Sequence, residues 1–384
     1  MRAYVFTDKV LERHAGRFVW LAINSELAKN APVRRKFPIP ALPSYFLVDP
    51  DSETVIVRWV GGASAARFDA FFDEQRAAWD RRHAPASGSP LDAALARADA
   101  LYGRGDHAGA AAAYREALAA APADWREYSR VVEAALFSMS MADDNEGVVT
   151  LAREALTRVR KRASAVTVAV SGLDGALALD KSHPQRAAWV AEFEAACREI
   201  ADDPAIVVEG DDRSSLLADL ASARQDAGDE AGAHAALERW SRFLDAEAAK
   251  AKTPDARAVF DSHRLSAYLE LGTPEKAVPM LQASERAMPD DYNPPARLAA
   301  AYKAMKRWDD ALAASDRAMA KAYGPRKLNF YQLRSEVFEA KGDFENARKT
   351  VEDAIAFAEA LPEGQRSQGR IDGFKKRLAG LAGK

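Results

Sequence analysis

The sequence predicts two fold classes in one chain: an α/β unit over residues 1–83 and an all-α helical solenoid over residues 91–384. Short apolar runs rich in aromatic and β-branched residues near the N-terminus are typical of buried strands. Beyond residue 90, glycine and alanine recur at the spacing of helical hairpins. Residues 84–90 carry the composition of a linker, with Pro, Ser and Gly in close succession. A length of 384 residues also suits two or more domains.

Composition excludes several classes of function. The 54 basic and 57 acidic residues leave a net charge of −3, so we expect no binding of nucleic acid or of an anionic membrane. Cys197 is the single cysteine, which excludes an intramolecular disulfide and a Cys-rich zinc site. The six histidines show no i,i+4 pairing, and we expect no metal and no cofactor. Residues 1–15 lack a signal-peptide pattern, and no run approaches the ~20 apolar residues of a membrane helix. As written, the sequence predicts a cytoplasmic protein.

The N-terminal unit is expected to combine strands and helices. Residues 18–23 (Phe-Val-Trp-Leu-Ala-Ile) are continuously apolar and predict a strand buried on both faces. Residues 24–37 leave room for a short helix. Residues 45–48 and 54–60 predict two further strands, and the turn residues 49–52 between them predict an antiparallel hairpin. Residues 64–82 carry an apolar stripe at helical spacing that would cover a mixed α/β sheet.

The run from Phe37 to Pro50 resembles a motif of the thioredoxin-like fold: a phenylalanine, a proline followed by Ser44, an apolar strand and an aspartate turn. The resemblance implies that the peptide bond between Leu42 and Pro43 is cis. It also implies that the backbone before the proline pairs with an extended substrate peptide, which makes Leu42 and Pro43 candidate site residues. The alternative is that Pro43 only begins a strand.

The family's first strand and its Cys-x-x-Cys sequence are missing from this chain. Either the unit is a redox-inactive descendant, or the start codon has been placed at an internal methionine, Met1. The second explanation is favoured because an uncovered sheet would cost several kcal/mol at ~25 cal/mol per Å2. It would make the protein a thiol–disulfide oxidoreductase with its cysteines upstream, and a missing leader could place it outside the cytoplasm.

The C-terminal half resembles tetratricopeptide repeats. Gly105-Asp106, Ala110, Tyr114 and Ala117 follow the helix–turn–helix spacing of that family, and three further alanine anchors, Ala277, Ala311 and Ala347, lie 34 and 36 residues apart. The resemblance is clearest at residues 91–124 and 258–361. Between residues 125 and 210 it weakens, although Val148 and Ala155 follow Ala110 and Ala117 by 38 residues and predict a lengthened repeat.

The family resemblance implies a groove along the first helices of the repeats, and therefore a protein or peptide partner. The polar candidates in this groove are Asn293, Arg297, Lys303, Asn329, Gln332 and Glu336, with Ser262, Ser266 and Glu339 beside them. Two glutamates, Glu336 and Glu339, lie on the first helix of the last repeat and would repel an acidic peptide tail. A partner with basic and amide character is therefore favoured. The alternative is that these are ordinary solvated positions. We predict a non-enzymatic interaction or scaffold protein with a redox-inactive module; the sequence leaves the oligomeric state open.

Overall fold

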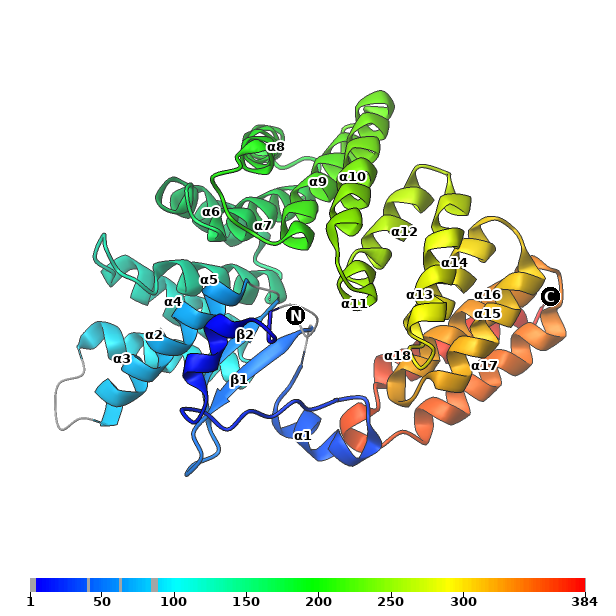
Figure 1. Ribbon diagram of the computed structural model, residues 1–384, viewed down its shortest axis with the longest axis horizontal. Coiled ribbons are helices and arrows are strands. Elements are labelled where there is room, and N and C mark those ends of the chain that lie inside the picture. The colour runs from blue at the N-terminus through cyan, green and yellow to red at the C-terminus, as the bar shows by residue number, and fades with distance from the viewer. Residues whose placement is uncertain (1–4, 40–41, 62–63, 84–88, 384) are drawn as a thin grey trace. The chain divides into compact units, whose positions relative to one another are not determined.

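The computed structural model describes residues 5–39, 42–61, 64–83 and 89–383 (Figure 1). The chain divides into two compact units. Unit 1 contains the residues up to Val19 together with Pro38–Phe243, and unit 2 contains Trp20–Phe37 together with Leu244–Lys384. The predicted linker at 84–88 lies outside the described residues, so a domain boundary there stays a prediction.

Unit 1 contains η1 (Lys9–His14) and, after it, a two-stranded antiparallel sheet that is covered on both faces. Strands β1 (Ser44–Val48) and β2 (Val55–Val60) form the predicted hairpin, with Ser44 opposite Val60. Helix α2 (Ala65–His83) covers one face with Phe68, Phe71 and Phe72, which pack on Trp59 of β2. Helix α3 (Pro90–Gly103) packs on β2 from the other side, where a Cβ on Gly103 would lie 2.7 Å from the Val55 side chain.

The prediction of a buried strand at residues 18–23 is wrong. These residues have no strand pairing, and Val19 and Leu21 are 88% and 76% exposed. The physical reason is the missing neighbour: a strand needs a partner for its backbone N–H and C=O groups, and β1 and β2 form the one sheet found among the described residues. A complete thioredoxin-like sheet is therefore not shown. The predicted cis bond between Leu42 and Pro43 is confirmed.

Helical hairpins form the remainder of unit 1, as the sequence predicts. Its helices follow one another as α3 (Pro90–Gly103), α4 (His107–Ala120), α5 (Tyr128–Met141), α6 (Asn145–Val159), α7 (Ser164–Ala178), α8 (Arg186–Asp202), α9 (Gly210–Asp226) and the first part of α10 (Glu230–Lys250). The region where the repeat signal weakens contains regular hairpins. Val148 and Ala155 are buried in α6, and the lengthened repeat stays a prediction.

Unit 2 combines an N-terminal segment with further hairpins. The segment contains η2 (Ala28–Asn30) and α1 (Ala31–Lys36). The hairpins follow as α11 (Pro254–Ala258), α12 (Asp261–Glu270), η3 (Pro274–Lys276), α13 (Ala277–Ala287), α14 (Asn293–Ala304), α15 (Trp308–Lys321), η4 (Gly324–Arg326), α16 (Lys327–Ala340), α17 (Phe344–Glu359), η5 (Glu363–Gln365) and α18 (Gln368–Leu381). The predicted anchors Ala277, Ala311 and Ala347 are fully buried, which confirms their role in close helix packing.

One turn design recurs between paired helices. The turn residue has a positive φ at Gly105, Gly228, Gly272 and Gly342, and also at Asp143 and Lys306. Glycine adopts this conformation without strain. An aspartate often follows and caps the second helix: the Asp106, Asp144 and Asp229 side chains each accept a hydrogen bond of 2.9 Å from the backbone N–H three residues on. No described helix is long and apolar enough to cross a membrane.

Candidate functional site

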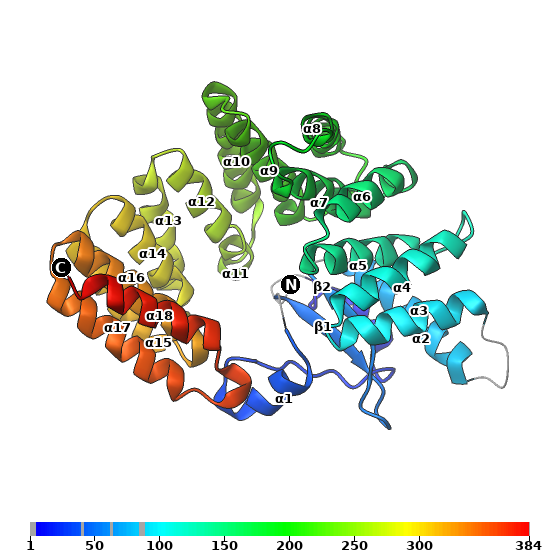
Figure 2. The same cartoon turned by 180° about the vertical axis from the view of Figure 1, so that it is seen from behind.

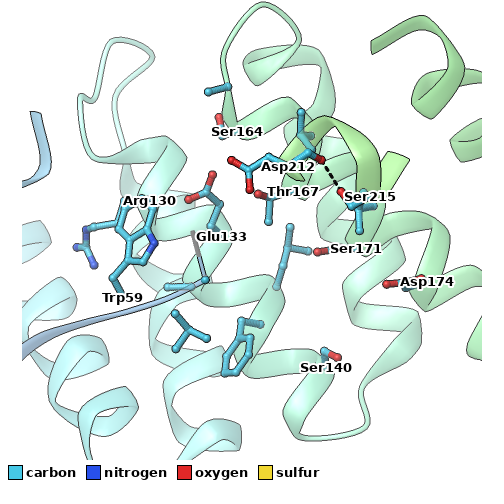
Figure 3. A pocket seen from close by; sticks show the side chains of 18 of the residues that line it. Trp59, Arg130, Glu133, Ser140, Ser164, Thr167, Ser171, Asp174, Asp212 and Ser215 are labelled. Carbon is cyan, nitrogen blue, oxygen red and sulfur yellow. Dashed lines mark hydrogen bonds between the residues drawn. The ribbon is translucent and has the colours of Figure 1, made fainter. Parts of the chain in front are cut away.

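A cavity of about 450 Å3 lies within unit 1 (Figure 3). Helices α5 and α7 supply most of its wall, and β2, α2, α3, α6, α9 and the loop before α9 supply the rest. Its polar lining contains hydroxyls, carboxylates and cationic side chains, with valines between them. The hydroxyls, carboxylates and amide are those of Ser64, Glu133, Ser140, Asn145, Ser164, Thr167, Ser171, Asp174, Asp212 and Ser215, and the arginines are Arg58, Arg67 and Arg130.

Helical periodicity brings these side chains to one surface. Thr167, Ser171 and Asp174 follow one another at spacings of four and three along α7, so they share one face of that helix. Glu133 and Ser140 stand seven residues apart on α5, which also places them on one face. The polar stripes of α5 and α7 therefore meet across the cavity. The repeat anchors in the sequence do not indicate this site, because its residues lie at polar positions between the anchors.

Two carboxylates face one another in the cavity. Figure 3 shows the side chains of Glu133 and Asp212 pointing toward each other, from α5 and α9. Burial raises the pKa of Asp212 to about 7, and the nearby charges of Asp211, Glu209 and Glu133 contribute to the rise. Burial also raises the pKa of Glu133, although Arg67 opposes this shift through an ion pair of 3.3 Å. Burial therefore disfavours the ionised form of both carboxyls, and the lining also carries Arg58, Arg67 and Arg130.

The arginines of the cavity differ in how many hydrogen bonds their guanidinium groups make. Arg130 is a buried residue of the cavity wall and donates hydrogen bonds to Asp99 at 2.8 Å and to Glu127 at 2.9 Å. Arg58 is 1% exposed and lies over the rings of Phe46 and Tyr102, at 5.3 and 5.2 Å. Its Nε and Nη2 atoms have no hydrogen-bond partner among the described residues. Burial lowers the pKa of this guanidinium.

The predicted groove residues lie in unit 2, where the structure brings three of them together. Lys303 of α14 donates a hydrogen bond to Glu336 of α16, and Gln332 donates to the same carboxylate at 3.1 Å. Asn329 stands apart from this group and accepts a bond of 2.8 Å from Arg370 of α18. The two helices thus satisfy much of their own polar surface, and a binding role for these residues stays a prediction.

The remaining predicted site residues are dispersed. Asn293 begins α14 and bonds to Asp291 through its backbone and side-chain nitrogens, both at 2.8 Å. Burial lowers the pKa of the Arg297 guanidinium, while the charge of Asp261 opposes the shift. In unit 1, Leu42 is 62% exposed next to the cis bond to Pro43.

No protein-family model matches the sequence, and the search of curated proteins found no match. Among solved structures, the chain is similar to a tetratricopeptide repeat protein from Parabacteroides merdae, with 12% identity, a TM-score of 0.47, and coverage of 77% of this chain and 99% of that one. It is also similar to BtubC from P. vanneervenii, with 17% identity, a TM-score of 0.38, and coverage of 62% and 96%. The TPR2AB domain of yeast Sti1 in complex with a pHSP90 peptide matches with 12% identity, a TM-score of 0.27, and coverage of 76% and 100%. The assignment of tetratricopeptide-like hairpins rests on the chain's own helices and turns.

Proposed function

We propose that the chain is a non-enzymatic protein-interaction protein whose unit 1 cavity binds a peptide segment that carries a lysine or arginine side chain. The observation that supports this proposal is the pair of facing carboxylates, Glu133 and Asp212, beside a row of hydroxyls. Of the arginines in the lining, Arg130 is neutralised by Asp99 and Glu127, and Arg67 pairs with Glu133 alone among the described residues. Such a surface offers hydrogen-bond acceptors to a cationic donor and apolar contacts to its methylene stem.

The electrostatics of the cavity favour a cationic ligand. A raised carboxyl pKa means that the surroundings disfavour the ionised form. A bound ammonium or guanidinium group would reverse this preference and draw Asp212 toward the ionised state. Binding would therefore release a proton near neutral pH, and the affinity would rise as the pH rises through about 7, where the Asp212 carboxyl titrates.

A protein ligand fits the site better than a lone metal ion. No cluster of three or more His, Cys, Asp or Glu side chains suited to a metal occurs among the described residues. The cavity of about 450 Å3 has room for several atoms of a peptide besides a charged group. The oxidoreductase alternative needs cysteines upstream of Met1, and the chain carries Cys197 alone.

Selection from a random peptide library displayed on phage would test this function. The full chain should enrich peptides that contain lysine or arginine, and Asp212→Asn should lower their affinity about tenfold, the loss expected for one charge-assisted hydrogen bond. Asp124→Asn is the matched control, because it removes the same charge from an exposed loop of unit 1.

The pH dependence provides a second readout. A selected peptide should bind the native chain more tightly at pH 8 than at pH 6, and this difference should shrink in Asp212→Asn. Enrichment of acidic peptides, or equal affinity for the native chain and Asp212→Asn, would contradict the proposal.

A further inference from the structure

An N-terminal segment of the chain occupies a surface of the C-terminal repeats. Residues 20–37 belong to unit 2, although the residues before and after them belong to unit 1. Figures 1 and 2 both show α1 of this segment beside the C-terminal helices, and α1 packs on η5. We call residues 24–31 the strap. It contacts the loops that precede α14, α16 and α18 in turn, at one edge of three successive hairpins.

The strap places one carboxylate in a defined polar site. Glu26 accepts a hydrogen bond of 2.9 Å from Arg326 of η4 and one of 3.3 Å from the hydroxyl of Tyr292, the residue before α14. The Glu26 side chain is only 12% exposed, so this ion pair is largely shielded from water. Two consecutive repeats therefore cooperate in binding one carboxylate.

The same edge recognises the backbone of the strap. The Gln365 side-chain amide donates hydrogen bonds of 3.0 Å to the carbonyl oxygens of both Ser25 and Leu27, and Gln365 itself is 4% exposed. Asn24 adds a side-chain bond of 2.6 Å to the hydroxyl of Tyr323. The strap forms a turn here: the backbone N–H of Leu27 donates to the carbonyl oxygen of Asn24 at 3.3 Å, and η2 follows at Ala28–Asn30.

Glycines allow the strap's backbone to lie close to the loops. A Cβ on Gly324 would lie 2.1 Å from the carbonyl oxygen of Glu26, and a Cβ on Gly364 would lie 2.2 Å from that of Ala31. Any larger residue at either position would collide with the strap's main chain. The two loops thus have room for a peptide backbone at the two points where the strap passes.

We propose that Tyr292, Tyr323, Arg326 and Gln365 form a peptide-binding site, here named the edge site, which the chain fills with its own strap. Its external ligand is a turn-forming segment of another protein that presents an asparagine and, two residues later, a glutamate. Arg326 selects the carboxylate, and Gln365 binds the backbone carbonyls on either side of it. The edge site is separate from the unit 1 cavity, and it does not depend on the function proposed for that cavity.

The strap has the properties of a displaceable occupant. Ala31 is the one residue of the strap with a buried side chain, and the other contacts are mainly polar. A tethered segment acts at an effective concentration of about 1 mM, so it competes with an external peptide without binding strongly itself. Release of the strap should therefore raise the apparent affinity for an external peptide by more than tenfold.

Fluorescence anisotropy on the full chain would test the edge site, with a labelled synthetic peptide of residues 23–33 as the probe. The double substitution Asn24→Ala with Glu26→Ala releases the strap, and we expect it to bind the probe at least tenfold more tightly than the native chain does. Lys29→Ala is the matched control, because it changes an exposed residue of the same segment. It should behave like the native chain.

The first test of carboxylate recognition changes the probe and leaves the protein unchanged. A probe with Glu26→Gln should bind the strap-released chain at least tenfold more weakly than the native probe. Adding Arg326→Gln to that chain should cause a similar loss for the native probe, with an unchanged circular dichroism spectrum. Equal binding of the two probes, equal affinity of the native and strap-released chains, or no binding to the strap-released chain would overturn the proposal.

Discussion

Asp99 of α3 and Arg130 of α5 form a buried ion pair, with 2.8 Å between the carboxylate Oδ1 and the guanidinium Nη1. Their side chains are 0% and 3% exposed. Tyr114 of α4 donates to the same carboxylate at 2.7 Å, and Glu127 accepts from the same guanidinium at 2.9 Å. One polar network thus joins three consecutive helices of unit 1 beneath the candidate cavity.

Removing one partner of this network should destabilise the protein strongly. Asp99→Leu would leave a guanidinium buried without its main partner, and we expect a loss of about 3 to 5 kcal/mol in the free energy of unfolding. The measurement is urea unfolding followed by far-UV circular dichroism. Combining Asp99→Leu with Arg130→Met should cost clearly less than the sum of the single changes.

An exposed ion pair in the same hairpin is the control for this network. Arg97 of α3 and Glu116 of α4 are paired, but both side chains are more than half exposed. Arg97→Met should cost at most about 1 kcal/mol, because water screens such a pair. Equal losses for Asp99→Leu and Arg97→Met would show that burial does not set the strength of these pairs.

Lys306 offers a position where a substitution should stabilise the chain. Its φ of 58° lies in the left-handed region, where four other hairpin turns have glycine. Lys306→Gly should relieve about 0.5 to 1 kcal/mol of backbone strain and raise the melting temperature. The matched control is Ala300→Gly inside α14, which should lower stability by about 1 kcal/mol. A melting temperature that falls in both variants would contradict this reading of the turn.

The repeats could be predicted because their signal is local. Alanines such as Ala311 and Ala347 recur at a fixed spacing, and each turn is specified by the residues within it. Two turns have Asp143 and Lys306 in place of glycine, so the glycine pattern does not indicate them. The alanines and valines around these turns still show the spacing of the repeats. Residues 45–48 and 54–60 were also predictable, because a short turn joins two strands that pair with each other.

The failures involve partners that are distant in sequence. An apolar run such as residues 18–23 has the composition of a buried strand, yet only a neighbouring strand could bury it. The strap likewise could not be predicted from local patterns, because Glu26 contacts Arg326, some 300 residues later in the chain. The unit 1 cavity was missed for the same reason, since Glu133 and Asp212 come from helices far apart in sequence.

The stability of unit 1 should depend on pH through Asp219. Burial raises the pKa of this α9 carboxyl to about 8, with a contribution from Asp174 of α7, and Cys197 of α8 is also near it. Its pKa in the unfolded chain is about 3.9. The folded state therefore holds an extra proton between about pH 4 and pH 8, so stability falls as the pH rises through this range.

Asp219→Asn should reduce this dependence and leave the part that Asp212 contributes. The variant should melt at a higher temperature than the native chain near pH 8, where ionisation of Asp219 opposes folding, and close to the native value near pH 4. Thermal unfolding followed by circular dichroism at both pH values measures the difference. The exposed substitution Asp124→Asn should leave the pH dependence unchanged. The prediction would be contradicted if the melting temperatures of the native chain and of Asp219→Asn changed by the same amount between pH 4 and pH 8.

Cys197 should be chemically inert in the folded protein. Its side chain is fully buried in α8, and burial, together with the charges of Asp219, Asp174 and Glu194, raises the pKa of the thiol. Because the thiolate is the reactive form, an aromatic disulfide reagent should label no thiol in the native chain at mildly alkaline pH. One thiol per chain should react in concentrated guanidinium chloride.

The same protein should not reduce the disulfides of insulin, since one cysteine cannot complete a dithiol cycle. Rapid labelling of the native chain, or measurable insulin reduction, would show that Cys197 is accessible and reactive.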